Sequence, residues 1–173
     1  MGAIFAFVCK SCGRVHEGSP SFGFDAPYQY ASLSEEQKAA MSKLTSDFCT
    51  ITHDEGTDRF IRTVLEIPII GVAEPFVWGV WVSLSEKSYS RYVDTYDDPL
   101  EGEVFFGWVC NTLPYYPPGG PLGANVVVQL GRQRPKLLLR TTEDPAHPLV
   151  IDQREGITVA RAQEIAEIAM HGT

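Results

Sequence analysis

Two cysteines, a glycine and a histidine occupy the segment CKSCGRVH near the N-terminus, residues 9–16. The turn of a C-x-x-C motif folds back tightly, so the thiolates of Cys9 and Cys12 can point at one tetrahedral cation. Such a turn often requires a left-handed residue after the second cysteine, and Gly13 adopts that conformation without steric cost. The segment therefore predicts a metal clip, with zinc as the expected ion.

A closed zinc site needs four ligands. We expect Cys49 as the third ligand, on a strand that passes beside the clip. The fourth ligand is open between His16, which gives a local C-x-x-C-x-x-x-H motif, and His53, which shares one strand face with Cys49. Reduced core thiols without metal and a redox pair are the alternatives. A thioredoxin-like pair should lie between a strand and a helix, but here a proline-rich loop follows.

A second polar group lies in HPLVIDQREG, residues 147–156, which contains His147, Asp152 and Gln153. A histidine near a carboxylate can act as an acid–base pair. However, the sequence has no G-x-S-x-G elbow to supply a nucleophile. We interpret the segment as a loop that fixes the last helix through hydrogen bonds to the backbone. The alternative is a small metal-dependent hydrolase, or another small-molecule enzyme, with a pocket near His147 and Asp152.

Two tryptophans lie three residues apart on one expected strand, so they face opposite sides of it. At least one packs in the core, and the other can form the floor of a pocket. Asn111 and the proline-rich segment that follows it can line a ligand site. The predicted ligand or partner surface comprises Trp78, Trp81, Asn111, His147, Asp152 and Gln153.

The chain has 173 residues and a formal net charge of −8. A polyanion such as nucleic acid, or an anionic membrane surface, would be repelled, whereas a basic protein partner would be attracted. No Lys or Arg precedes the first apolar run, as a signal peptide would require, and no stretch approaches the roughly 20 apolar residues of a membrane span. Four cysteines are too few for a disulfide scaffold. We therefore expect a cytoplasmic protein.

Hydrophobic periodicity predicts about three helices and about seven strands, with few strand–helix–strand alternations. This favours a mostly antiparallel α+β domain over residues 1–173, with residues 4–18 as a metal-binding hairpin flap. The segments 19–30, 111–124 and 142–156 are expected to be loops. Helices are expected at 34–45, 85–96 and 157–171, and strands at 47–54, 58–69, 74–85, 103–110, 125–130 and 135–141, besides the hairpin.

The order of several motifs resembles the bacterial family called domain of unknown function 2199. These motifs are C-x-x-C-G-x-x-H, LTSDFC, FVWGVWVSLS, N-x-L-P-x-Y-P and HPLVIDQREGI. The resemblance runs from Cys9 to the final helix and implies a bacterial cytoplasmic protein, without an established activity. It implies Cys9, Cys12 and Cys49 as matching positions, and it favours His16 as the fourth ligand because GRVH continues the opening motif.

Together these features predict a non-enzymatic binding module with a structural zinc site. An immunity or antitoxin-like role fits this prediction, since such proteins are often small and acidic and block basic toxins by charge complementarity.

Overall fold

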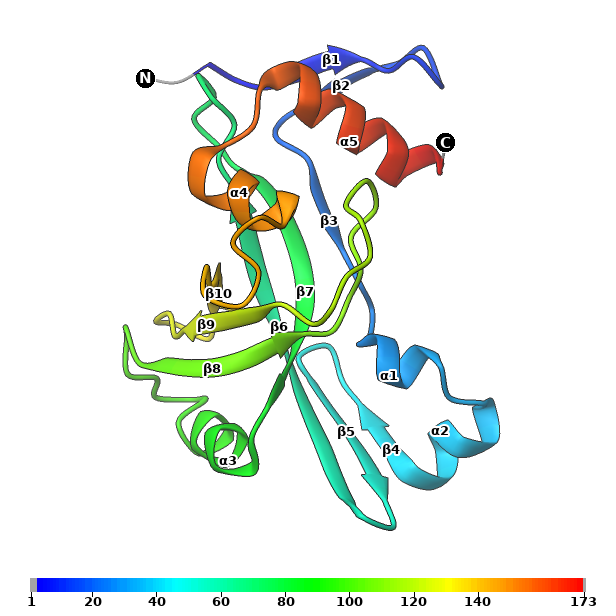
Figure 1. The fold of residues 1–173 in the computed structure, drawn as a ribbon, viewed down its shortest axis with the longest axis vertical. Coiled ribbons are helices and arrows are strands. Elements are labelled where there is room, and N and C mark those ends of the chain that lie inside the picture. Colours follow the sequence, from blue (N-terminus) through cyan, green and yellow to red (C-terminus); the bar gives the residue numbers. More distant parts are fainter. Residues whose placement is uncertain (1–2, 173) are drawn as a thin grey trace.

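The computed structural model of the chain describes residues 3–172 and has a mixed α+β fold (Figure 1). The α+β class expected from the sequence is confirmed, although this part of the chain contains five helices rather than about three. The elements in chain order are β1 (Ala6–Val8), β2 (Val15–Glu17), β3 (Ser21–Gly23), α1 (Tyr28–Ala31), α2 (Glu35–Met41), β4 (Ser42–Leu44), β5 (Phe48–His53), β6 (Gly56–Ile67), β7 (Phe76–Leu84), α3 (Glu86–Asp94), β8 (Val104–Val109), β9 (Gly123–Val127), β10 (Lys136–Leu139), α4 (Pro148–Glu155) and α5 (Val159–His171).

Strands β6 to β10 form a closed five-stranded barrel. The pairing runs β7–β8–β9–β10–β6, and β6 pairs again with β7 over nine residues. Fully buried residues alternate with less buried ones along most of these strands, which places one face of each in the barrel interior. Gly107 lets β8 cross β7 closely, because a Cβ atom at this position would lie 3.0 Å from the carbonyl oxygen of Ser83.

Two strand pairings depart from the expected antiparallel sheet. β3 pairs with β7 in parallel, and β10 closes the barrel against β6 in parallel. The remaining named strand pairings of residues 3–172 are antiparallel, including β9 with β10, which form the expected hairpin. The sheet therefore differs from the prediction in its closure and in these two contacts, both of which join strands far apart in the sequence.

Helix α4 forms in the segment 142–156, which the sequence analysis interpreted as a loop. Pro148 occupies its first turn, where a missing N–H costs nothing, and the ring of His147 accepts the N–H of Leu149 at 3.1 Å. The expected helix at 34–45 ends at Met41 instead, because the next three residues pair with β5 as β4. The expected loop 19–30 likewise contains β3 and α1.

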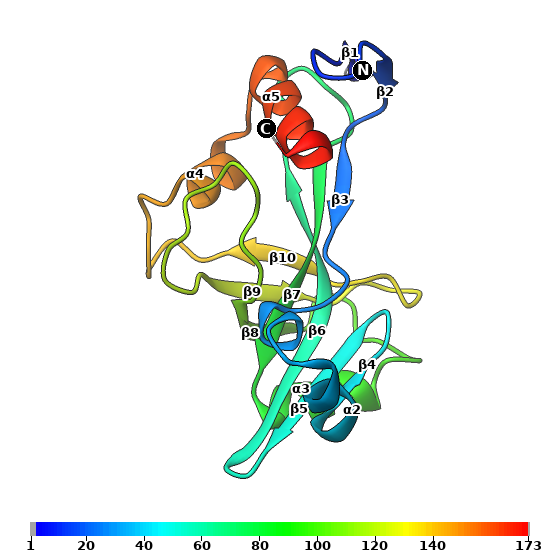
Figure 2. The same ribbon diagram turned by 90° about the vertical axis from the view of Figure 1, so that its right-hand side faces the viewer.

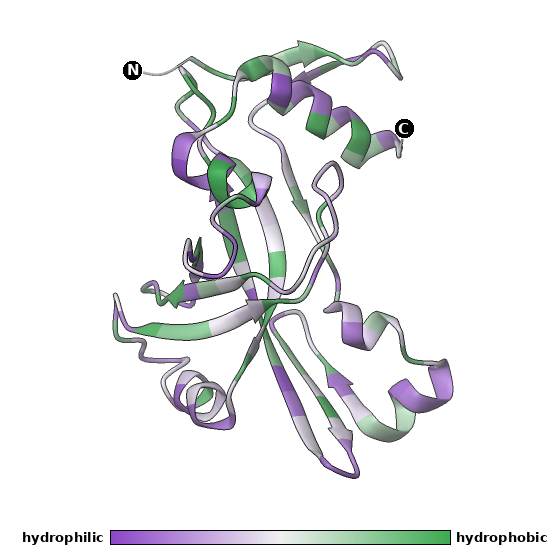
Figure 3. Ribbon diagram, in the orientation of Figure 1, coloured by the Kyte–Doolittle hydropathy of each residue, from purple (hydrophilic) through white to green (hydrophobic). Residues whose placement is uncertain are grey.

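Both tryptophans of β7 are buried. Trp78 lies in the main core, where its ring contacts Phe22 and Phe76, while Trp81 packs in a smaller cluster with residues of β5 and β6 and with Cys110. Other elements cover each side of β7, so both side chains contribute to packing, and a pocket floor formed by one of them stays a prediction. Hydrophilic residues form the first part of α2 and the tip of the β5–β6 hairpin (Figure 3).

The N-terminal hairpin β1–β2 forms its own two-stranded sheet at the end of the molecule occupied by α5 (Figures 1 and 2). Phe5, Phe7 and Cys9 alternate with exposed residues and pack into the main core. The side chain of Gln163 in α5 donates to the carbonyl of Val8 at 3.3 Å. The hairpin is therefore fixed against the C-terminal helix even though the two lie at opposite ends of the sequence.

Within residues 3–172, the helices are too short or too polar to cross a bilayer.

Candidate metal centre

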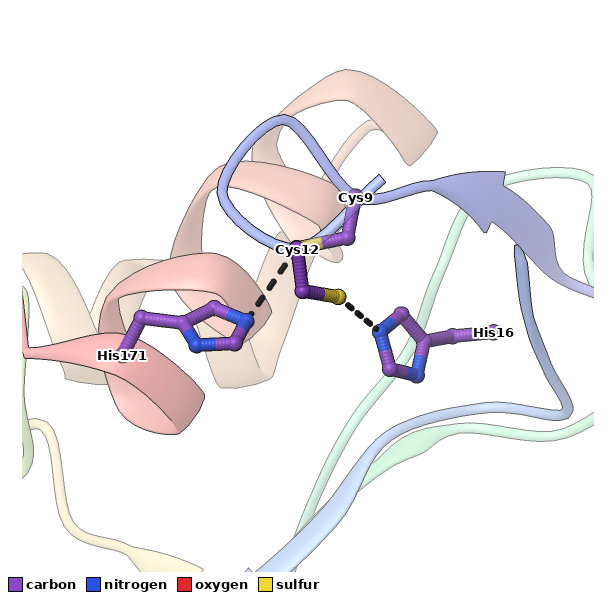
Figure 4. Close-up of side chains that lie close together, drawn as sticks. All are labelled: Cys9, Cys12, His16 and His171. Atoms are coloured by element: carbon purple, nitrogen blue, oxygen red, sulfur yellow. Dashed lines mark hydrogen bonds between the residues drawn. The ribbon is translucent and has the colours of Figure 1, made fainter. Parts of the chain in front are cut away.

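Four potential metal ligands meet where the β1–β2 hairpin contacts the end of α5. They are Cys9, Cys12, His16 and His171, and their donor atoms all lie within 4.8 Å of one another. The Cys9 sulfur lies 3.2 Å from Nε2 of His171, and the Cys12 sulfur lies 3.4 Å from Nε2 of His16 (Figure 4). The side chains converge on one point from two elements, which is the arrangement that a single tetrahedral ion requires.

The turn between β1 and β2 positions the two sulfurs. The N–H of Gly13 donates to the carbonyl of Cys9 at 2.8 Å, and the N–H of Cys9 donates to the carbonyl of Arg14 at 2.9 Å. Gly13 has a φ of 70°, and a Cβ atom there would meet nothing within 4 Å. The glycine is therefore required by its left-handed backbone and not by lack of space, as the sequence predicted.

Helix α5 carries the fourth donor in its last turn. Thr158 caps the start of the helix by accepting the N–H of Arg161 at 3.2 Å. One turn before His171, Glu167 accepts the backbone N–H of Lys10 at 3.0 Å. This contact holds the cysteine turn beside the histidine ring.

The electrostatics of the site ease the ionisation of Cys9. Burial opposes ionisation, but hydrogen bonds from the backbone N–H groups of Cys12 and Ser11 outweigh it, and the pKa of the Cys9 thiol is lowered. Two thiolates and two neutral imidazoles would balance the charge of a divalent cation. Such an S₂N₂ set suits zinc, which accepts both donor types in a tetrahedral shell. The residues present therefore fit the expected ion.

The structure corrects the expected third ligand. Cys49 faces inward from β5 and packs against Ile51, Phe60, Trp81 and Cys110 in the smaller core cluster. Burial raises the pKa of its thiol to about 11, so this sulfur is held as a neutral thiol. Figure 1 shows β5 at the other end of the molecule from β1 and β2.

His53 also lies outside the cluster. It stands at the exposed end of β5, where its Nε2 atom lies 3.0 Å from a carboxylate oxygen of Asp58. The β5–β6 hairpin pairs His53 with Gly56 and so brings Asp58 close. Of the two histidines that the sequence left open, the structure brings only His16 to the sulfurs.

His171 is the ligand candidate that sequence reasoning missed. The chain has four histidines, and this one ends an amphipathic helix whose residue Glu167 lies one turn earlier on the same face. The spacing of Glu167 and His171 places two polar side chains on one face at the C-terminal end of the helix. It does not show which element the end contacts.

His147 and Asp152 make hydrogen bonds that hold α4 against the neighbouring loop and helix. His147 caps α4 through Nδ1, and its Nε2 lies 3.3 Å from the carbonyl oxygen of Pro117. The buried carboxylate of Asp152 accepts from the hydroxyl of Tyr116 at 2.8 Å and pairs with Arg161 at 2.7 Å. These contacts join the proline-rich loop to α4 and α5.

Gln153 and Asn111 extend the backbone hydrogen bonding of strands. The Gln153 amide accepts the N–H of Leu139 and donates to the carbonyl of Leu137, each at 2.7 Å, and it also lies 3.4 Å from the carbonyl oxygen of Glu66. It therefore bridges β10 and β6 beyond the one residue pair at which these strands meet. Asn111 accepts the N–H of Trp81 at 2.8 Å. A pocket of about 160 Å³ is lined by Asn111 and His147, but not by Trp78, Trp81, Asp152 or Gln153.

Fold and site together define an α+β protein with a five-stranded barrel and a surface Cys₂His₂ cluster. The chain belongs to the bacterial family described as "Uncharacterized protein conserved in bacteria (DUF2199)", which matches residues 8–157. The resemblance seen in the sequence is thus confirmed. The match includes Cys9, Cys12 and His16 and ends before His171. Neither the curated proteins nor the solved structures contain a significant match.

Proposed function

We propose that this protein is a non-enzymatic binding module whose N-terminal hairpin is fixed to its C-terminal helix by a structural zinc ion. The observation that carries the proposal is the convergence of four sulfur and nitrogen donors within 4.8 Å. Three of them come from one short hairpin and the fourth from α5, so one ion would link segments that are 162 residues apart along the chain.

A structural role fits this geometry better than a catalytic one. A catalytic zinc keeps one coordination position for water or substrate, whereas four protein ligands fill the tetrahedral shell. Because the unfolded chain does not hold these donors together, the free energy of zinc binding would stabilise the folded state. At free zinc about 100-fold above the dissociation constant, the gain is about 3 kcal/mol.

Metal analysis of the full-length protein, purified under reducing conditions, tests the site. We expect one equivalent of zinc per chain in the wild type. Cys12→Ser or His171→Ala should weaken zinc binding by more than about tenfold, the effect expected even for changes in the outer shell of a site. The melting temperature of the wild type should fall when a chelator removes zinc.

His53→Ala is the matched control, because it removes an exposed histidine from the far end of the molecule. This variant should keep both the zinc and the response to chelator. A wild-type protein that binds no zinc, or that loses zinc with His53→Ala but not with His171→Ala, would contradict the proposal.

A basic protein is the partner that best fits the charge of −8. The outer face of β8 offers a contact surface for it, since Val104, Phe106 and Trp108 are 53%, 37% and 38% exposed and lie on one side of the strand. Aromatic side chains of this kind often dominate protein interfaces. An immunity or antitoxin-like role, in which the protein blocks a basic toxin, follows as the finer proposal.

A small metal-dependent hydrolase with a pocket near His147 and Asp152 has less support. Asp152 is engaged by Tyr116 and Arg161, and His147 is engaged by the backbone of α4. An acid–base role would require both residues to exchange these contacts for a substrate.

A further inference from the structure

We propose that a hydroperoxide oxidises Cys9 and Cys12 to a disulfide, which expels the metal and releases the last turn of α5 from the hairpin. This inference rests on the metal site proposed above and assigns it a redox regulation.

The two sulfurs are placed to form a disulfide. Only two residues separate Cys9 from Cys12, and their sulfur atoms belong to the group of donors that lies within 4.8 Å. Both side chains project from the same turn toward the centre of the cluster (Figure 4). A disulfide requires the sulfurs to approach to about 2.05 Å, which rotation of these side chains within the turn can supply.

The two cysteines differ in access to solvent, and this sets the order of the reaction. Cys12 is exposed, whereas Cys9 is fully buried beneath the turn. The Cys12 sulfur therefore meets the oxidant first, and Cys9 acts as the resolving cysteine. A neighbouring resolving cysteine is typical of reversible redox sites.

The reaction balances in two steps. The Cys12 sulfur attacks one oxygen of the hydroperoxide, the O–O bond breaks, and a sulfenic acid and a hydroxide (or alkoxide) result. The Cys9 sulfur then attacks the Cys12 sulfur, the S–S bond forms, and the S–O bond breaks with loss of hydroxide. The two thiolates lose two electrons, and the hydroperoxide gains them. Two protons from solvent then complete the products. Hydrogen peroxide gives two molecules of water, and an organic hydroperoxide gives one of water and one of an alcohol.

Loss of both sulfurs leaves the ion with His16 and His171, which is half of a tetrahedral shell. His171 is exposed at the end of α5, and the polar contacts that remain there, from Glu167 to Lys10 and from Gln163 to Val8, are themselves exposed. Phe5 and Phe7 stay packed in the core. The release is therefore local to the cysteine turn and the end of α5, and the barrel is retained.

The other two cysteines provide an internal comparison. Cys49 and Cys110 are buried in the smaller core cluster, and burial raises the pKa of both thiols. Neutral buried thiols react slowly with peroxides. Oxidation should therefore be selective for the cysteine turn.

The experiment treats zinc-loaded full-length protein with increasing hydrogen peroxide and follows zinc release with a chromophoric chelator. We expect complete loss of the bound zinc together with a mass decrease of two hydrogen atoms. Because trypsin cleaves after Lys10 and Arg14, the disulfide should join the peptide 1–10 to the peptide 11–14. Cys49 and Cys110 should remain open to alkylation after denaturation.

Amide hydrogen exchange supplies a second measurement. Exchange in the last turn of α5 should accelerate after oxidation, while exchange in β6 and β7 stays unchanged, and a dithiol with zinc should restore both metal and protection. Two results would overturn this inference alone. In one, the protein retains its zinc at peroxide doses that oxidise exposed thiols. In the other, it releases zinc without forming the Cys9–Cys12 disulfide. Reduced protein that binds no zinc would instead overturn the proposed function.

Discussion

Burial divides the cysteines of this protein into two chemical kinds. Cys12 is exposed beside two histidines, and the pKa of the nearby Cys9 thiol is lowered by backbone donors. Cys49 and Cys110 lie among apolar side chains, and burial raises the pKa of each thiol. Since a thiol binds metal as the thiolate, the first pair suits coordination and the second pair suits packing.

Cys49→Ser separates these roles at the scale of one residue. We expect the variant to bind as much zinc as the wild type, because Cys49 lies outside the cluster. Its hydroxyl would be buried among Ile51, Phe60 and Trp81, which should lower the free energy of unfolding by about 1–3 kcal/mol. Metal analysis and urea denaturation measure the two effects. Loss of zinc in a folded Cys49→Ser protein would return Cys49 to the ligand set.

At the scale of elements, an ion pair ties the β4–β5 turn to the β9–β10 hairpin. Arg134 donates from Nε to Asp47 at 2.7 Å, and Ser46 donates to the second carboxylate oxygen at 2.9 Å. Burial of the Asp47 carboxyl opposes ionisation, but the hydrogen bonds from Arg134 and Ser46 outweigh it, so its pKa is lowered. The pair thus connects two hairpins that are separated in the sequence by the strands of the barrel.

Asp47→Asn should lower the free energy of unfolding at neutral pH by about 1 kcal/mol, because it removes a partly buried charged hydrogen bond. A lowered pKa in the folded state contributes stability above the unfolded pKa of about 3.9, and this contribution is lost as the pH falls through the folded value. The difference between wild type and variant should therefore be constant from pH 7 to about pH 5 and shrink below about pH 4. Urea denaturation across this range measures it. A difference that grows toward acid pH would contradict the assignment.

At the scale of the whole molecule, the metal cluster and the proposed partner surface lie apart. The cluster joins the hairpin to α5 at one end, whereas β8 lies on the side of the barrel (Figure 1). Zinc would therefore stabilise the module without contacting the partner. The charge of −8 acts over the whole surface and would speed association with a basic protein at low salt.

Trp108→Ala tests the partner surface. A basic protein that co-purifies with the wild type should bind the variant more than about tenfold more weakly, as expected for an aromatic hot spot, and its binding should weaken as salt rises. Ile4→Ala is the control, since Ile4 is also apolar and highly exposed but lies in the segment before β1 and not on β8. A partner that is acidic, or that binds Trp108→Ala as tightly as the wild type, would contradict the proposal.

Local patterns in the sequence determined most of the elements and three of the four residues of the metal cluster. Alternation in β5 and strand-forming residues such as Val, Trp and Phe in β6 to β8 predicted these strands, and the C-x-x-C-G-x-x-H motif brought Cys9, Cys12 and His16 together within one hairpin. These features depend on residues only a few positions apart. Turn chemistry and side-chain periodicity are therefore enough to fix them.

The tertiary structure alone decided the closure of the barrel, the burial of Trp78 and Trp81, and the exchange of Cys49 for His171. Each of these three features depends on which segments, far apart in the sequence, pack together. Cys49 and His171 carry equally plausible donor atoms in the sequence, but β5 faces the core at one end of the fold, while α5 ends beside the cysteine turn at the other. The choice of ligand follows from packing over the whole chain, which short-range sequence spacing does not encode.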